Sequence, residues 1–196
     1  MADQLDVLPR SVPGSVAGAA EDAALAELLA GIARGDGQAL ERLYKSLSGP
    51  VFGVALWRTG SREDAADVVQ ETFLRIVRQR DRIGGVRRPK VWVLTVAHRL
   101  AVDVTRRRRR FVPDPEVELP LVQAPTSDPA RAVDAARASA LLAGLPAKQR
   151  EAVFLHHFEG LTFAAIGDIV GIPTFTAASR YRLGIARLRR AMEVCP

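Results

Sequence analysis

A proline-rich stretch near the middle of the sequence divides the chain into two parts. Residues 111–128 hold acidic side chains and four prolines, namely Pro113, Pro115, Pro120 and Pro125. Proline lacks a backbone N–H and clashes with the preceding helical turn, so prolines at this density cannot continue a helix. The sequence therefore predicts an extended acidic linker between two separately folded blocks.

Helical periodicity fills the sequence on both sides of this linker, and no alternating strand pattern competes with it. The predicted helices are 21–33, 37–58, 62–80, 89–109, 129–143, 147–158, 162–169 and 174–193. Asp36 and Ser61 are predicted N-caps. The predicted fold is all-α, with two small helical domains: a flexible tail at 1–20, a first domain at 21–110, the linker at 111–128 and a second domain at 129–196.

Charge and cysteine content indicate the kind of partner and the compartment. The chain has 28 Lys and Arg against 22 Asp and Glu, a net charge of +6. This excess favours a polyanionic partner, with nucleic acid ahead of an acidic membrane. The single cysteine, Cys195, cannot form an internal disulfide, which suits a reducing cytosol. No apolar run approaches the roughly 18 residues of a membrane span. We therefore expect a soluble, cytoplasmic protein.

Residues 161–192 have the pattern of a helix-turn-helix. Thr162 is placed to cap a short helix, Gly171 to form a tight turn, and Pro173 to open the next helix. On a helical wheel, the inward side of that next helix holds Ala177, Tyr181, Ile185, Leu188 and Met192, and its other side holds Thr176, Ser179, Arg180, Arg182 and Arg190. Hydroxyl and arginine side chains suit major-groove recognition. The plainer alternative is a helical hairpin with a solvated arginine face.

The predicted helix 62–80 has one apolar and one acidic side. Its apolar side consists of Ala65, Val68, Val69, Thr72, Phe73 and Ile76. Asp64, Asp67 and Glu71 gather on the other side. Solvation is the default explanation for such carboxylates, and docking of a basic protein partner is the alternative.

The predicted helix 89–109 is basic instead. Its buried side consists of Trp92, Val93, Val96, Ala97, Leu100 and Val104. Thr95, His98, Arg99 and Arg106 are expected on the opposite, outward side. The run of five arginines at 106–110 complements the helix dipole, but it exceeds what a cap requires and favours binding to phosphates.

Together these stretches resemble the extracytoplasmic-function (ECF) group of the sigma-70 family. REDAADVVQETFLR resembles region 2.2, VWVLTVAHRLAVDVTRRRRR resembles regions 2.3 and 2.4, and LPAKQREAVFLHHFEGLTFAAIGDIVGIP resembles region 4. The resemblance covers roughly 36–110 and 145–192. It implies a sigma factor that binds core RNA polymerase, recognises the −35 and −10 promoter elements and helps to melt the DNA.

The resemblance also assigns roles to residues. The positions that meet core polymerase match Asp64, Asp67, Gln70 and Glu71. The −10 surface matches Lys90, Trp92, Thr95, His98 and Arg99, with Arg106 of the arginine run beside them. The −35 recognition helix matches Thr176, Ser179, Arg180 and Arg182. An inhibitory anti-sigma protein, often membrane-bound in this family, is a further implied partner.

The sequence departs from the family pattern in the recognition helix and in region 2.3. Phe175 stands where the family often has glycine, Ala178 where it has lysine or arginine, and Leu183 at a position that is usually polar. His98-Arg99 replaces the usual Arg-Asn pair. The first three changes affect the expected −35 sequence preference.

Two other functions compete with this interpretation. A DNA-binding regulator that never joins polymerase would use only the helix-turn-helix and would leave the acidic helix unexplained. An enzyme would need ligands or catalytic groups from His98, His156, His157 and Cys195, or Mg²⁺ at the acidic helix. Adjacent histidines on a helix point in different directions and chelate poorly. We therefore predict no catalytic residue, no metal, no cofactor and no small-molecule substrate.

Overall fold

The computed structural model describes residues 16–111 and 140–194, with side chains described over 19–108 and 140–193. Most of the predicted tail at 1–20, nearly all of the linker at 111–128, the start of the predicted helix 129–143, and Cys195 lie outside the described residues.

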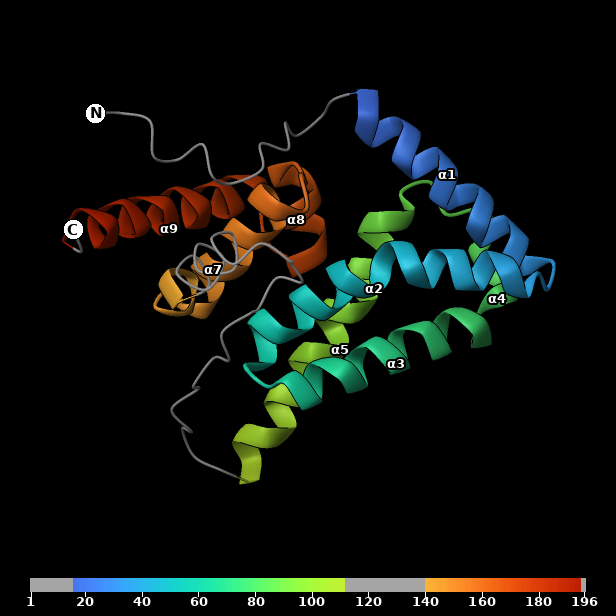
Figure 1. Cartoon of the computed structure of the whole chain (residues 1–196), viewed down its shortest axis with the longest axis horizontal. Coiled ribbons are helices and arrows are strands. Elements are labelled where there is room, and N and C mark those ends of the chain that lie inside the picture. Colours follow the sequence, from blue (N-terminus) through green and yellow to red (C-terminus); the bar gives the residue numbers. More distant parts are fainter. Residues whose placement is uncertain (1–15, 112–139, 195–196) are drawn as a thin grey trace, which may run out of the picture.

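The described residues form helices and contain no strand, which confirms the all-α prediction. The first domain consists of α1 (Val16–Ala33), α2 (Gly37–Thr59), α3 (Arg62–Arg78), α4 (Arg80–Ile83) and α5 (Pro89–Phe111). The second domain consists of a helical turn at 140–143, α7 (Ala147–Val153), the π-helical turn η1 (Phe154–Phe158), α8 (Phe163–Val170) and α9 (Thr174–Val194). Most helix ends fall within two residues of the predicted ones. The main difference is α1, which begins within the predicted tail (Figure 1).

Side-chain caps fix the beginnings of α2 and α3. Asp36 Oδ1 accepts hydrogen bonds from the backbone N–H groups of Gln38 at 2.8 Å and Ala39 at 3.2 Å. Ser61 Oγ accepts one from Asp64 N at 3.2 Å. These bonds satisfy N–H groups that have no partner within the helix. Both predicted N-caps are confirmed.

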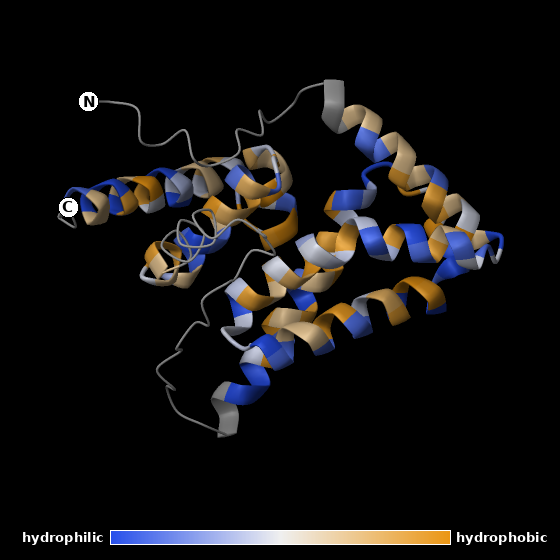
Figure 2. Cartoon of the chain, viewed as in Figure 1, coloured by the Kyte–Doolittle hydropathy of each residue, from blue (hydrophilic) through white to orange (hydrophobic). Residues whose placement is uncertain are grey.

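The first domain packs α1, α3 and α5 around α2. Figure 2 shows hydrophobic and hydrophilic residues recurring along these helices, as amphipathic helices require. The fully buried side chains at the centre include Leu29, Leu43, Leu47, Ile76 and Leu94. The predicted apolar side of α3 is buried throughout, from Ala65 to Ile76, which confirms that prediction.

The second domain contains the predicted helix-turn-helix. Thr162 Oγ1 accepts a hydrogen bond from Ala165 N at 3.2 Å and begins α8. Gly171 ends α8 with φ +73°, a conformation that favours glycine. Gly167 allows the following turn to pass close by, because a Cβ there would lie 2.7 Å from Ile172 O. The predicted inward side of α9 is confirmed: Ala177 is fully buried, and Tyr181, Ile185, Leu188 and Met192 are half-buried.

The two domains pack directly against each other (Figure 1). One apolar core runs through both, so that Ile166 and Leu155 belong to the same cluster as Leu94. Phe154 lies against Gly53 of α2, where an added Cβ would overlap its ring. Arg150 donates to Trp57 O at 3.3 Å across the domain boundary. Burial lowers the pKa of Arg150 to about 10, so it remains charged at neutral pH.

Candidate polymerase and promoter interfaces

The acidic residues of α3 share one outer face. Asp67 and Gln70 are exposed, whereas Asp64 and Glu71 are half-buried. Glu71 Oε1 lies 3.0 Å from Arg75 Nε, and Asp64 Oδ2 lies 3.4 Å from Arg108 Nη1. Asp64 and Glu71 are thus paired with nearby arginines. Asp67 is exposed and has no ion pair among the described residues.

An apolar groove continues this face between α2 and α3. It has a volume of about 490 Å³, and its lining includes Gln70 and the side chains of Leu40, Tyr44, Phe73, Leu74 and Val77. Tyr44, Leu74 and Val77 are large apolar side chains that remain exposed. The sequence analysis missed this groove, although Leu74 and Val77 lie outside the buried stripe of α3 and could have signalled it. Charge and apolar surface together make this face suited to docking a protein.

Lys90 begins the predicted −10 surface at the start of α5, but the second domain covers it. Its side chain is only 13% exposed. Its Nζ lies 3.3 Å from Glu159 Oε2 and 3.3 Å from Glu21 Oε1, and it donates to Glu159 O at 3.2 Å. Burial raises the pKa of Glu159, and the charge and hydrogen bond of Lys90 partly oppose that rise.

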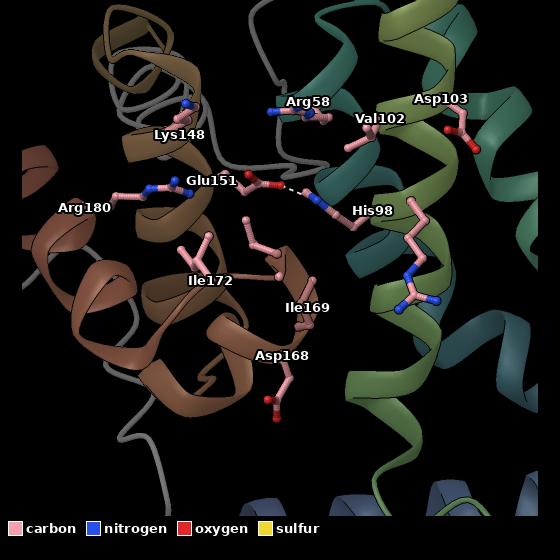
Figure 3. A pocket seen from close by; sticks show the side chains of 13 residues that line it. Arg58, His98, Val102, Asp103, Lys148, Glu151, Asp168, Ile169, Ile172 and Arg180 are labelled. Carbon is pink, nitrogen blue, oxygen red and sulfur yellow. Dashed lines mark hydrogen bonds and ion pairs between the residues drawn. The ribbon is translucent and has the colours of Figure 1, made fainter.

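His98 is buried two turns further along α5. The residue is 5% exposed, and its Nδ1 lies 2.6 Å from Oε1 of Glu151, which is itself 2% exposed (Figure 3). The helical wheel placed His98 on an outward side, and that placement is wrong. The wheel identifies the side that packs within the first domain, whereas α7 and α8 of the second domain cover the other side.

The remaining residues of the predicted −10 surface differ in accessibility. Trp92 is half-buried against the core, and the Thr95 hydroxyl donates to Val91 O at 2.7 Å. Arg99 and Arg106 are exposed. In this arrangement, Arg99 and Arg106 are therefore the members of the set whose side chains are exposed.

A cavity of about 390 Å³ lies between the domains. Its cationic lining comes from both sides, with Arg58 and Arg99 from the first domain and Lys148 and Arg180 from the second. Figure 3 labels Arg58, Lys148 and Arg180 around the cavity. Asp168 also lines it, and the Asp168 Oδ2 atom lies 2.6 Å from Arg88 Nη1. The pairs of Arg88, Lys90 and His98 thus form three polar links across the domain boundary.

The predicted −35 residues lie on α9 with unequal exposure. Arg182 is exposed, whereas Thr176, Ser179 and Arg180 are half-buried. Arg180 lines the cavity between the domains. Two large apolar side chains on this helix are also exposed: Phe175 at 75% and Leu183 at 53%.

The adjacent histidines are engaged in packing. His156 Nδ1 lies 2.8 Å from Leu161 O, and its ring stacks on Phe163 at 4.3 Å between centroids. Burial lowers the pKa of His157. Within residues 16–111 and 140–194, no cluster of three His, Cys, Asp or Glu side chains could hold a metal, and no helix is long and apolar enough to cross a membrane.

The fold and its surfaces define an all-helical, two-domain protein with a helix-turn-helix in its second domain. Sequence models of two domains match the chain: sigma-70 region 2 matches residues 43–111, and sigma-70 region 4 matches residues 136–188. The chain belongs to the sigma-70 family, and the resemblance to its ECF group that the sequence indicated is confirmed.

Individual relatives agree with this assignment. The ECF RNA polymerase sigma factor SigC of Mycobacterium tuberculosis is 31% identical over 177 residues, covering 89% of this chain and 92% of SigC. SigL of the same species, also named an ECF RNA polymerase sigma factor, is 29% identical over 168 residues, covering 84% of this chain and 95% of SigL.

Two solved structures share the fold. The sigma factor RpoE of Bartonella quintana, solved with the anti-sigma factor NepR, has a TM-score of 0.65 at 22% identity, covering 80% of this chain and 98% of RpoE. CnrH, solved with the cytosolic domain of CnrY, has a TM-score of 0.61 at 20% identity, covering 88% of this chain and 99% of CnrH.

Proposed function

We propose that this chain is an ECF-type sigma factor that binds core RNA polymerase, recognises −35 and −10 promoter elements and helps to melt the DNA. It works in the cytoplasm and has no catalytic residues of its own. The observation that supports this most directly is the presence of both sigma-70 domains, in the family's order, on one basic chain.

Core polymerase binds the outer face of α3 in this proposal. Asp67 and Gln70 are exposed there. The adjoining groove at Tyr44 and Leu74 offers apolar surface whose burial on binding is favourable. Carboxylates steer and orient a basic partner, whereas apolar burial provides most of the affinity. The face remains open while the two domains are packed together, so polymerase can meet it first.

Promoter DNA binds two other surfaces. The −10 strand lies along α5 at Lys90, Trp92, Thr95, His98, Arg99 and Arg106, where unpaired bases stack on aromatic groups and phosphates meet cations. The −35 duplex meets α9 at Thr176, Ser179, Arg180 and Arg182. Lys90 and His98 are covered by the second domain. Region 4 must therefore move off region 2 before the −10 strand can bind.

An anti-sigma protein is a further proposed partner. RpoE, which shares this fold, was solved with the anti-sigma factor NepR, and CnrH, which also shares it, was solved with the cytosolic domain of CnrY. A protein that bound across both domains of this chain would hold them packed together. It would thereby keep Lys90 and His98 covered and the chain inactive.

Run-off transcription with purified core polymerase and genomic promoter fragments tests the proposal. We expect defined transcripts that require this chain and start downstream of a shared pair of sequence elements. A pull-down with core polymerase separates the competing function of a free DNA-binding regulator. Failure to associate with core polymerase would refute the sigma-factor function.

A further inference from the structure

Phe175 is the large apolar residue with the greatest exposure in the described part of the chain. It is the second residue of α9, the second helix of the helix-turn-helix, and it is 75% exposed. An exposed phenylalanine lacks the favourable free energy that burial of its ring would provide. A ring held in water at this position suits a surface that is covered only when a partner binds.

The position of Phe175 places it where such a helix meets base edges. Residues at the N-terminal end of a recognition helix enter the major groove. Gly171, with φ +73°, and Pro173, whose carbonyl accepts from Thr176 N at 2.9 Å, fix the direction in which α9 begins. Phe175 and Arg182 are seven residues apart and therefore lie nearly on one line along the helix.

The neighbours of Phe175 indicate DNA rather than an apolar protein surface. Thr174 and Thr176 flank it, and α9 carries five arginines and a single acidic residue, Glu193. The other exposed apolar side chain of the helix, Leu183, is eight residues away, about 12 Å along the axis. Phe175 is thus an isolated apolar group on a basic, hydroxyl-bearing helix, and a protein interface would instead require a contiguous apolar patch.

We propose that Phe175 packs against the 5-methyl group of a thymine in the −35 element and so helps to set its sequence preference. The thymine methyl is the apolar group that base edges present in the major groove, and phenylalanine is among the side chains that contact it. The inference rests on the proposed −35 function and adds a specificity-determining residue to it. Arginines supply the affinity for phosphate, and Phe175 selects thymine.

Replacing thymine by uracil tests this contact because the change removes only the methyl group. Holoenzyme assembled from core polymerase and the full chain first selects duplexes from a library randomised over the −35 region. Each thymine of the selected element is then replaced by uracil, one at a time, and binding is measured. We expect one replacement to weaken wild-type binding about fourfold, the effect of removing one buried carbon from the contact.

The same duplexes are then bound by holoenzymes carrying Phe175→Ala or, as a control, Glu193→Ala, which removes an exposed side chain at the far end of the same helix. Phe175→Ala should bind the thymine and uracil duplexes equally, and Glu193→Ala should retain the fourfold difference. The inference is overturned if wild type selects a −35 element but no uracil replacement matters, or if Phe175→Ala keeps the difference. A third outcome is that wild-type holoenzyme selects no −35 sequence at all. That result would refute the proposed −35 function itself, and the role of Phe175 would be refuted with it.

Discussion

His98 of α5 and Glu151 of α7 meet at 2.6 Å between Nδ1 and Oε1, although they lie 53 residues apart in the sequence. Both are buried, and the contact joins the predicted −10 surface of region 2 to the helix-turn-helix domain. The Glu151 Oε2 atom has no hydrogen-bond partner among the described residues. A buried pair with one unsatisfied oxygen holds the domains together less firmly than a fully bonded one.

Gly53→Ala should separate the two domains without lowering the stability of the first domain. Alanine in place of glycine favours a helix interior by about 1 kcal/mol, but a Cβ at this position overlaps the Phe154 ring of the second domain. Energy transfer between dyes at Lys45→Cys and Arg190→Cys, in a Cys195→Ser background, should fall. Gly49→Ala on the same helix is the control, because a Cβ there meets nothing within 4 Å. Equal transfer in both variants would contradict the packing described.

Charge reversal at Asp67 and Glu71 should weaken binding to core polymerase at least tenfold. Both groups lie on the outer face of α3, so the fold should be retained, which circular dichroism can check. The weakening should diminish as salt is raised, because screening acts on exposed charges. Glu27→Lys with Asp81→Lys makes the same change of net charge on α1 and α4 and should leave binding intact. Wild-type affinity in the first double variant would refute the docking role.

Leu74→Asn tests the apolar groove separately from the carboxylates. Leu74 is exposed in the free chain, so the substitution should change the free energy of unfolding by no more than about 0.5 kcal/mol. If polymerase covers this side chain, the loss of its burial should weaken binding about tenfold. Unlike the charge reversal, this loss should persist at high salt. A titration of labelled chain with core polymerase at two ionic strengths measures both properties.

Glu159→Gln should change how stability depends on pH. The pKa of Glu159 is raised in the folded chain because burial disfavours its charged form. The stabilisation from its protonated form is therefore complete below the unfolded value of 4.5 and is lost as the pH rises through the raised pKa. Urea unfolding of wild type should show this decrease in the free energy of unfolding at pH values above 4.5, and the Gln variant should lack it. If the free energy of unfolding had the same pH dependence in wild type and in the Gln variant, burial of the charged Glu159 side chain would not destabilise the fold.

Local sequence patterns predicted most of the helices and their ends. Asp36, Ser61, Thr162 and Gly171 act through residues two to four positions away, so the cap and turn geometry follows from the sequence. Periodicity likewise identified the buried side of α3, because that side packs within one domain. These features depend on short-range contacts, and a single sequence contains the information for them.

The sequence by itself determined the helices, the family and which side of each helix packs within its own domain. Tertiary structure alone decided which of the remaining sides are open. His98, for example, was expected to face outward but is buried against Glu151 of the second domain. The physical reason is that packing between the domains brings together side chains that are far apart in the sequence. Helical periodicity reflects only residues close in the sequence, so it cannot predict such contacts.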